Sequence, residues 1–230
     1  MEPGTAAAEP ARDCQLCPRL VAFRALNRTN APDWFNGAVP SFGNADARFL
    51  IVGLAPGLNG ANRTGRPFTG DYAGDLLYTT LIEFGFATGS YDARPDDGLT
   101  LDDCMITNAV RCVPPQNKPV PAEIANCEPF LRARIAQLPK LQVILALGRI
   151  AHDSTLKALG ARRSQYPFAH GARHEVPGAP LLIDSFHCSR YNTNTRRLTP
   201  EMFRAVFTDV RNLLPQRNGL GKSGRRRVPV

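Results

Sequence analysis

The chain has 230 residues, 43% of them hydrophobic, and a formal net charge of +8. This length is enough for one α/β domain with a sizeable core, and the composition is that of an ordinary globular protein. No apolar run approaches the roughly 18 residues that a membrane-spanning helix needs. Residues 1–13 lack the apolar stretch of a secretory signal. We therefore expect a protein of the cytoplasm with no membrane partner.

Four short apolar segments predict buried strands. They cover residues 48–53, 104–108, 142–147 and 180–184, and most are rich in Ile, Leu or Val. Helical patterns lie between or beside them. Strands that alternate with helices predict a parallel sheet covered on both faces.

The helical patterns carry recognisable start and stop signals. Leu77 and Leu81 share a helix face that stops before Gly85. The strongest pattern is the last one, which follows Thr199, a favoured N-cap residue, and Pro200, which suits a first turn. We expect a well-formed helix there, with one apolar stripe against the sheet.

The sequence indicates one folded domain between two tails. Residues 14–215 predict a single domain, and residues 1–13, rich in Ala, Pro and Gly, predict a loose N-terminal tail. Residues 216–230 predict a flexible basic tail, which either attracts nucleic acid without specificity or only aids solubility. Residues 87–100 and 160–180 predict long loops, which are often functional in compact domains.

Four of the six cysteines form a candidate metal site. Cys14 and Cys17 are spaced as C-x2-C, and Cys112 and Cys127 flank a proline-rich loop whose stiffness helps to hold its ends close. Pro129 predicts a helix that begins just after Cys127. Four thiolates can hold either a zinc ion or an iron–sulfur cluster. A zinc ribbon usually has two close pairs, so one close pair with two dispersed cysteines favours the cluster.

A glycine-rich loop at residues 53–71 follows the first predicted strand. Ligands bind at the carboxyl ends of strands in open α/β sheets, and this loop offers backbone amides, Phe68, Asp71, Arg63 and Arg66. A cradle for phosphate alone would need neither Phe68 nor Asp71, and no P-loop lysine follows the glycines. Asp71 has a second interpretation as a helix N-cap, and the two arginines either bind phosphate or hold the loop.

A second polar loop follows the fourth predicted strand. It carries, in order, His187, Ser189, Arg190, Tyr191 and Asn192. A histidine at the carboxyl end of a strand, with polar motifs at the other strand ends, indicates a functional residue rather than a packed one. We expect the two remaining cysteines, Cys104 and Cys188, to be buried structural residues.

These motifs resemble the uracil-DNA glycosylase superfamily, and most closely its family 5, the B-type enzymes. The matching stretches are residues 53–71, 107–112, 114–119 and 187–195, together with the four cysteines. Two positions depart from related patterns. Leu54 stands where family 4 enzymes carry Glu, which is typical of family 5 and goes with looser base selection. Cys188 stands where a proline is usual.

The resemblance implies a three-layer α/β/α fold around a central four-stranded parallel sheet. It also implies a structural [4Fe–4S] cluster on Cys14, Cys17, Cys112 and Cys127. The implied partner is DNA that contains uracil or other deaminated bases. The implied protein is a monomer of the prokaryotic cytoplasm, associated with the nucleoid.

The resemblance also implies roles for single residues. Phe68 would stack on a flipped base, Asn108 would bond its Watson–Crick edge, and Gly53 and Ala55 would complete the base site. Asp71 would stabilise positive charge on the sugar or orient water, and His187 would stabilise negative charge on the O2 atom of the leaving base. The implied DNA contacts are Arg63, Arg66, Ser189, Arg190, Tyr191 and Asn192.

The expected reaction is hydrolysis of the N-glycosidic bond of a flipped base, leaving an abasic site. No lysine lies in these motifs to form a Schiff base, so we expect a monofunctional enzyme without a lyase step. The alternative from another class is a non-catalytic nucleic-acid-binding module with a structural metal. Such a module has no need of Phe68, Asp71, Asn108 and His187 at successive strand ends.

Overall fold

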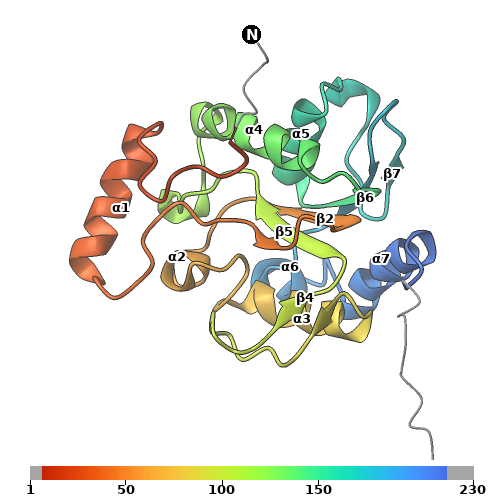
Figure 1. Cartoon of the computed structure of the whole chain (residues 1–230), viewed down its shortest axis with the longest axis horizontal. Helices are drawn as coiled ribbons and strands as arrows, with labels where there is room; N and C mark the ends of the chain where they lie inside the picture. The colour runs from red at the N-terminus through yellow and green to blue at the C-terminus, as the bar shows by residue number, and fades with distance from the viewer. Residues whose placement is uncertain (1–6, 217–230) are drawn as a thin grey trace, which may run out of the picture.

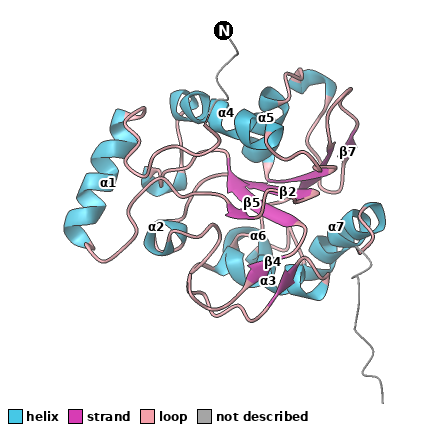
Figure 2. Cartoon of the chain, viewed as in Figure 1, coloured by secondary structure: helices cyan, strands magenta, loops and turns pink. Residues whose placement is uncertain are grey.

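The computed structural model describes residues 7–216, and the predicted sheet lies at its centre (Figure 1 and Figure 2). Four parallel strands form it, in the order β5 (Cys104–Asn108), β2 (Phe49–Gly53), β6 (Val143–Leu147) and β8 (Leu181–Ser185). Two short antiparallel strands extend its edges, β1 (Phe42–Gly43) beside β5 and β7 (Arg173–His174) beside β8. All four predicted strands are confirmed to within one residue.

Two helices cover each face of the sheet. They are α3 (Tyr72–Glu83) and α7 (Pro200–Leu213) on one face, and α4 (Pro121–Ala136) and α5 (Arg149–Ala158) on the other. Successive strand residues point to opposite layers. Accordingly, Phe49 packs with the α3 and α7 side chains, while its neighbour Leu50 packs with those of α4 and α5. The structure therefore confirms the three-layer α/β/α architecture.

The last helix, α7, begins where its capping signal predicts. Thr199 precedes it, and the Thr199 Oγ1 atom accepts a hydrogen bond from the Met202 amide at 3.2 Å. The apolar stripe on this helix packs against the sheet, where the rings of Phe207 and Phe49 meet edge to face with centroids 6.0 Å apart. Local capping and amphipathicity were thus sufficient to predict this element.

The strand register brings the polar loops together. Gly53, at the end of β2, lies opposite Asn108, at the end of β5. Leu147, at the end of β6, lies opposite Ser185, at the end of β8. Because these strands are parallel, all four carboxyl ends lie at the same edge of the sheet, and the loops that follow them form one surface.

The described part of the N-terminal segment, residues 7–13, corrects the expectation of a loose tail there. Within the described residues, Ala8 is only 5% exposed. The Glu9 carboxylate forms ion pairs with Arg111 and Arg134 at 2.8 and 2.6 Å. Composition indicates flexibility, but it cannot show that the buried Arg111 guanidinium needs an acidic partner from this segment.

Three helices lie outside the central layers. They are α1 (Pro18–Asn30), α2 (Ala61–Thr64) and α6 (Arg190–Asn194). Residues 1–6 and 217–230 lie outside the described part of the chain, and the predicted basic tail falls almost entirely in the second of these ranges. None of the described helices is long and apolar enough to cross a membrane.

Helix α4 contradicts the prediction that a helix starts after Cys127. It begins at Pro121 and continues through Pro129, so Cys127 lies inside it. The helix start is well defined, because Pro121 occupies the first turn and Glu123 accepts a hydrogen bond from the Val120 amide at 2.9 Å. An interior proline removes one backbone hydrogen bond without ending this helix.

The two predicted long loops contain short regular elements. Residues 87–100 start and end in a small hairpin of β3 (Ala87–Thr88) and β4 (Thr100–Leu101). Residues 160–180 contain β7 and the 3-10 turn η2 (Arg163–Gln165), and another such turn, η1 (Pro115–Asn117), lies in the proline-rich loop.

Candidate active site

A cavity of about 650 Å³ opens at the edge of the sheet where the parallel strands end. The sequence-predicted residues that line it are Ala55, Phe68, Asp71, Asn108, His187, Ser189 and Arg190. The lining also includes Leu54, Gly57, Asn59, Gly70, Tyr72, Ala73 and Asn117. The side chains predicted to bind a base and to cleave its bond therefore share one cavity.

Phe68 and Asn108 approach closely over Gly53. A Cβ atom on Gly53 would lie 2.4 Å from Asn108 Oδ1 and 2.6 Å from Phe68 Cζ, so only glycine fits there. Asn108 is 3% exposed, and its Oδ1 atom has no hydrogen-bond partner among the described residues. An unpaired buried acceptor costs about 1–3 kcal/mol, so a ligand that donates a hydrogen bond here removes that cost.

Asp71 caps a helix and also lines the cavity. It is the N-cap of α3, where its carboxylate accepts a hydrogen bond from the Gly74 amide at 3.4 Å. Its other oxygen faces the glycine-rich loop, since Cβ atoms on Gly57 and Gly60 would lie 2.7 and 2.3 Å from Asp71 Oδ2. Burial raises the pKa of Asp71, although the amides of α3 oppose that rise.

His187 faces Phe68 across the cavity. The two rings are stacked at an angle of 26°, with centroids 5.8 Å apart. Burial lowers the pKa of His187 to about 4, so its imidazole is neutral near pH 7. The next residue, Cys188, is fully buried, and its thiol donates to the Ala73 carbonyl at 3.4 Å. Cys188 thus packs the loop against α3, in keeping with the structural role predicted for it.

The loop after His187 forms the short helix α6. Ser189 caps this helix by accepting a hydrogen bond from the Asn192 amide at 3.4 Å, and Asn192 Nδ2 donates to the His187 carbonyl at 2.8 Å. Tyr191 is 72% exposed, and the Arg190 guanidinium lies 5.2 Å from the centre of the Tyr72 ring. Ser189 and Asn192 therefore shape the loop, while Tyr191 projects into solvent beside the cavity.

The two arginines of the glycine-rich loop differ in their surroundings. Arg63 is exposed beside Gly70 at the edge of the cavity. Arg66 is 5% exposed and forms an ion pair with Asp97 at 2.7 Å. The prediction that Arg66 contacts DNA is therefore corrected, because a buried guanidinium with a bidentate carboxylate partner holds the loop instead.

Comparison with known proteins agrees with this geometry. A sequence model of the uracil DNA glycosylase superfamily matches residues 40–211. The chain belongs to this superfamily. It is 46% identical over 206 residues to the type-5 uracil-DNA glycosylase of Thermus thermophilus, with 87% of this chain and 93% of the relative covered. The predicted resemblance to family 5 is confirmed.

Two further relatives show how far the likeness extends. The type-5 uracil-DNA glycosylase of Mycobacterium tuberculosis is 39% identical over 209 residues, covering 87% of this chain and 78% of the relative. The type-4 uracil-DNA glycosylase of Thermotoga maritima is 37% identical over 203 residues, covering 88% of each protein. The match to the superfamily model, residues 40–211, includes every residue that lines the cavity.

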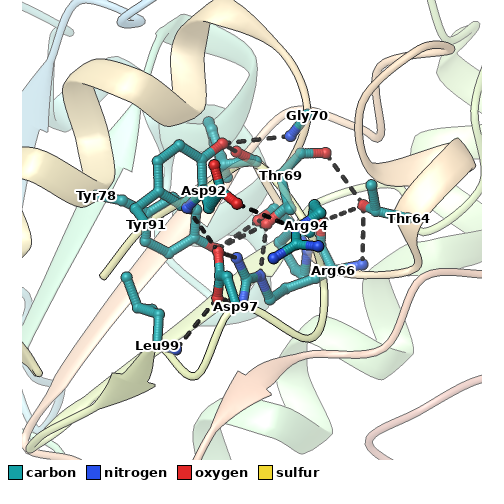
Figure 3. A network of polar contacts seen from close by, with 12 residues as sticks. Thr64, Arg66, Thr69, Gly70, Tyr78, Tyr91, Asp92, Arg94, Asp97 and Leu99 are labelled. Atoms are coloured by element: carbon teal, nitrogen blue, oxygen red, sulfur yellow. Dashed lines mark hydrogen bonds and ion pairs between the residues drawn. The ribbon is translucent and has the colours of Figure 1, made fainter. Parts of the chain in front are cut away.

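This member of the superfamily holds its glycine-rich loop with a polar network that sequence reasoning missed (Figure 3). Arg66 and Asp97 form its ion pair, and Arg66 Nε also donates to Thr69 Oγ1 at 2.7 Å. The Tyr91 hydroxyl lies between Phe68 and Gly70. Tyr91 and Asp97 fall in the predicted loop of residues 87–100, where only the length of the loop suggested a function.

The four predicted cysteine ligands lie together. Cys17, Cys112 and Cys127 are buried in one small cluster, with Cys14 packed against it. Polar hydrogens point at two sulfur atoms: Arg24 Nη1 donates to Cys112 Sγ and Asn126 Nδ2 donates to Cys17 Sγ, both at 3.6 Å. Burial raises the pKa of Cys112 to about 12. Thiolates here would need a compensating cation, so this all-sulfur donor set fits a metal centre.

A buried network at the far edge of the sheet was also missed. The Asp184 carboxylate lies 2.7 Å from His152 Nδ1 and 2.8 Å from His174 Nε2. His152 Nε2 lies 2.9 Å from the Tyr166 carbonyl. These contacts tie α5, β7 and β8 together and do not reach the cavity. Isolated histidines in the sequence gave no signal that they would meet one aspartate.

Proposed function

We propose that this chain removes uracil from DNA by hydrolysing the N-glycosidic bond of an extruded nucleotide. The observation that carries the proposal is the shared cavity lined by Phe68, Asp71, Asn108 and His187. One cavity thus offers an aromatic face, an amide, a carboxylate and an imidazole. A base inside a duplex is out of reach, so the target must first leave the stack.

Base binding is supported by Phe68 and Asn108. Flipping costs a few kcal/mol, and stacking on an aromatic ring returns about 1–3 kcal/mol. The unpaired Asn108 Oδ1 atom is an acceptor for the imide N–H of uracil. The ring centroids of Phe68 and His187 are 5.8 Å apart. A base stacked between the two rings would need a separation of roughly 7 Å, which is two stacking distances. The His187 ring therefore turns aside when a base stacks on Phe68.

Cleavage of the N-glycosidic bond places positive charge on the sugar and negative charge on the base. Two side chains in the cavity are suited to stabilise these two charges. Asp71 faces the glycine-rich loop as a carboxylate and stabilises positive charge on the sugar, or orients the attacking water. His187 is neutral near pH 7, so it stabilises negative charge on the leaving base by donating a hydrogen bond from its one ring N–H group. No lysine lines the cavity among the described residues, which supports a monofunctional enzyme that leaves an abasic site.

The substrate range extends to other deaminated bases. Leu54 and Ala55 line the cavity with apolar surface, so base selection there depends on few polar contacts. A pocket that relies on shape and apolar contact discriminates weakly among similar ligands. The support for a broad range is therefore the apolar side chain at position 54, because leucine offers no hydrogen bond to a bound base.

The DNA around the target base lies over the cavity mouth. Tyr191, exposed on α6, enters the space that the extruded base has left, with Arg190 beside it. Arg63 contacts a phosphate, and Ser189 and Asn192 maintain the loop. The enzyme acts as a monomer on chromosomal DNA in the nucleoid.

Cys14, Cys17, Cys112 and Cys127 would hold a [4Fe–4S] cluster as the metal centre. When bound, the cluster supplies a structural tie and takes no part in base release. The four cysteines come from the segment before α1, the loop after β5, and α4. Cross-linking these three segments fixes the loop after β5, which carries Asn117 into the cavity lining.

Base release from defined duplexes tests the function. Duplexes that contain uracil, hypoxanthine or xanthine opposite each normal base are incubated with catalytic amounts of protein, and alkali then reveals abasic sites. We expect strand breaks at uracil after alkali and none without it. Breakage without alkali contradicts the monofunctional assignment. DNA binding without breakage contradicts the enzyme and supports a binding module.

A further inference from the structure

We propose that Tyr91 and Asp97 are positioning residues for Phe68, the residue assigned to base stacking. Neither side chain lines the cavity. Tyr91 acts through the backbone of Phe68 and Gly70, and Asp97 acts through Arg66 and the segment that carries Tyr91. Together they form a clamp, by which we mean the contacts that Tyr91 and Asp97 make with the glycine-rich loop (Figure 3). The inference depends on the proposed function only because that proposal assigns base stacking to Phe68.

The backbone of Phe68 needs to be held. Its φ is +54°, in the left-handed region that L-residues with bulky side chains rarely adopt. Such a conformation is energetically unfavourable and persists only where the surroundings enforce it. It also turns the Phe68 ring toward the cavity, so the unfavourable backbone and the useful ring position occur together.

The Tyr91 hydroxyl bridges the two ends of this strained turn. It donates to the Phe68 carbonyl and accepts from the Gly70 amide, both at 3.2 Å. Burial raises the pKa of Tyr91 to about 12, so the hydroxyl keeps the proton that it donates. Gly74 leaves room for the Phe68 carbonyl, because a Cβ atom there would lie 1.8 Å from that oxygen.

Tyr91 is itself fixed by its neighbours. Its ring stacks on Tyr78 with centroids 4.6 Å apart and an angle of 24°. The Tyr78 hydroxyl donates to the Pro67 carbonyl at 2.6 Å, so the residue before Phe68 is also held. Two tyrosines therefore contact consecutive carbonyls of the glycine-rich loop.

Asp97 locks the segment that carries Tyr91. Its side chain is fully buried and accepts hydrogen bonds from Arg66 Nη1 and Nη2 at 2.8 and 2.7 Å. It also accepts from the amides of Asp92 and Leu99 at 3.0 and 3.1 Å. One carboxylate thus closes the segment around Tyr91 and joins it to Arg66, two residues before Phe68.

The test compares two variants that each lose one hydroxyl. Tyr91→Phe removes the bridge and leaves the ring stack. Thr88→Val removes an exposed hydroxyl that pairs with Thr100 in the same hairpin and takes no part in the bridge. We expect Tyr91→Phe to lower single-turnover release of uracil about 10- to 100-fold, because misplaced reacting groups cost rates of that order. DNA affinity should stay near wild type, and the variant should remain folded at the assay temperature. Thr88→Val should release uracil at the wild-type rate.

A double-mutant cycle separates positioning from a general structural role. In a Phe68→Ala background the ring is gone, so adding Tyr91→Phe should change the rate little further. Rate losses that multiply fully contradict the proposal, as does a wild-type rate for Tyr91→Phe alone.

Hydrogen exchange gives a readout that does not depend on activity. The Gly70 amide should exchange faster in Tyr91→Phe, which removes its acceptor, and faster to a smaller extent in Asp97→Asn, while Thr88→Val leaves it unchanged. Unchanged Gly70 protection in Tyr91→Phe refutes the clamp. If the wild-type protein releases no uracil but Gly70 protection falls as expected, the clamp stands and the proposed function fails.

Discussion

Asp71 caps α3 through Gly74 and also faces the cavity beside Gly60, so one carboxylate serves a helix and a candidate reaction. Its burial is unfavourable for the charged form, and the α3 amides only partly offset that. His187 is held neutral by the same kind of burial. At the residue scale, therefore, burial shifts the pKa values of both ionisable groups toward their neutral forms, and such shifted pKa values are typical of functional sites.

Asp71→Asn should bind DNA normally but lose most base release. Asn is as good an N-cap as Asp, so α3 and the loop keep their shape while the negative charge is lost. In the wild type, release should fall on the acid side as Asp71 is protonated, at a pH above the usual range for an aspartate. The measurement is the single-turnover rate on a G·U duplex against pH. A wild-type rate for Asp71→Asn contradicts the assigned role.

The same variant should be more stable than wild type near pH 7. A carboxyl whose folded-state pKa is raised favours the protonated form on folding, so its charged form destabilises the protein above that pKa. Asn removes this cost. The stability gain should shrink as pH falls through the raised pKa and disappear below the unfolded value. Denaturant unfolding of both proteins at several pH values measures the difference, and lower stability of Asp71→Asn at pH 7 contradicts it.

At the element scale, α3 and β8 show how single side chains join segments. The start of α3 depends on Asp71, and the Phe68 carbonyl approaches α3 at Gly74. At the other edge of the sheet, Asp184 of β8 joins β7 and α5 through His174 and His152. These side-chain contacts fix the positions of the helices and loops relative to the ends of the strands.

Asp184→Asn should destabilise the fold by about 2–4 kcal/mol. An amide cannot accept from two histidines and from the Ala169 amide as a carboxylate does, so buried donors lose their partners. The cavity lies elsewhere, so the rate of base release per folded molecule should stay near wild type. Chemical denaturation followed by activity at a temperature well below unfolding tests both parts. Unchanged stability contradicts the structural role.

The whole molecule depends on contacts between its N-terminal segment and the domain. Cys14 and Cys17 lie beside Cys112 and Cys127. Glu9 forms ion pairs with Arg111 and with Arg134, which lies on α4. Segments from the start and the middle of the chain therefore close one side of the domain. A metal centre bound only by the folded state adds its binding free energy to stability.

Cys112→Ser should lose the metal centre and melt at a lower temperature. Cys104→Ala is the matched control, because Cys104 is fully buried in the sheet, outside the cysteine cluster. Iron, acid-labile sulfide and zinc are measured in all three proteins. We expect iron and sulfide in the wild type and in Cys104→Ala only. One equivalent of zinc without iron in the wild type contradicts the [4Fe–4S] assignment.

Periodicity and spacing in the sequence alone determined the four strands, the last helix and the order of the polar loops, because these depend on neighbouring residues and on parallel topology. Phe68, Asp71 and His187 followed from their places in the loops at strand ends, whereas Asn108, Gly53 and Ala55 followed from the family resemblance. Only the tertiary structure decided that Arg66 is buried, because its partner Asp97 lies 31 residues away. Likewise, Glu9 is held by Arg111 from far along the chain, and packing lets α4 continue through Pro129. Partners that are distant in the sequence decide whether a charged side chain is buried, and no local sequence pattern reveals those partners.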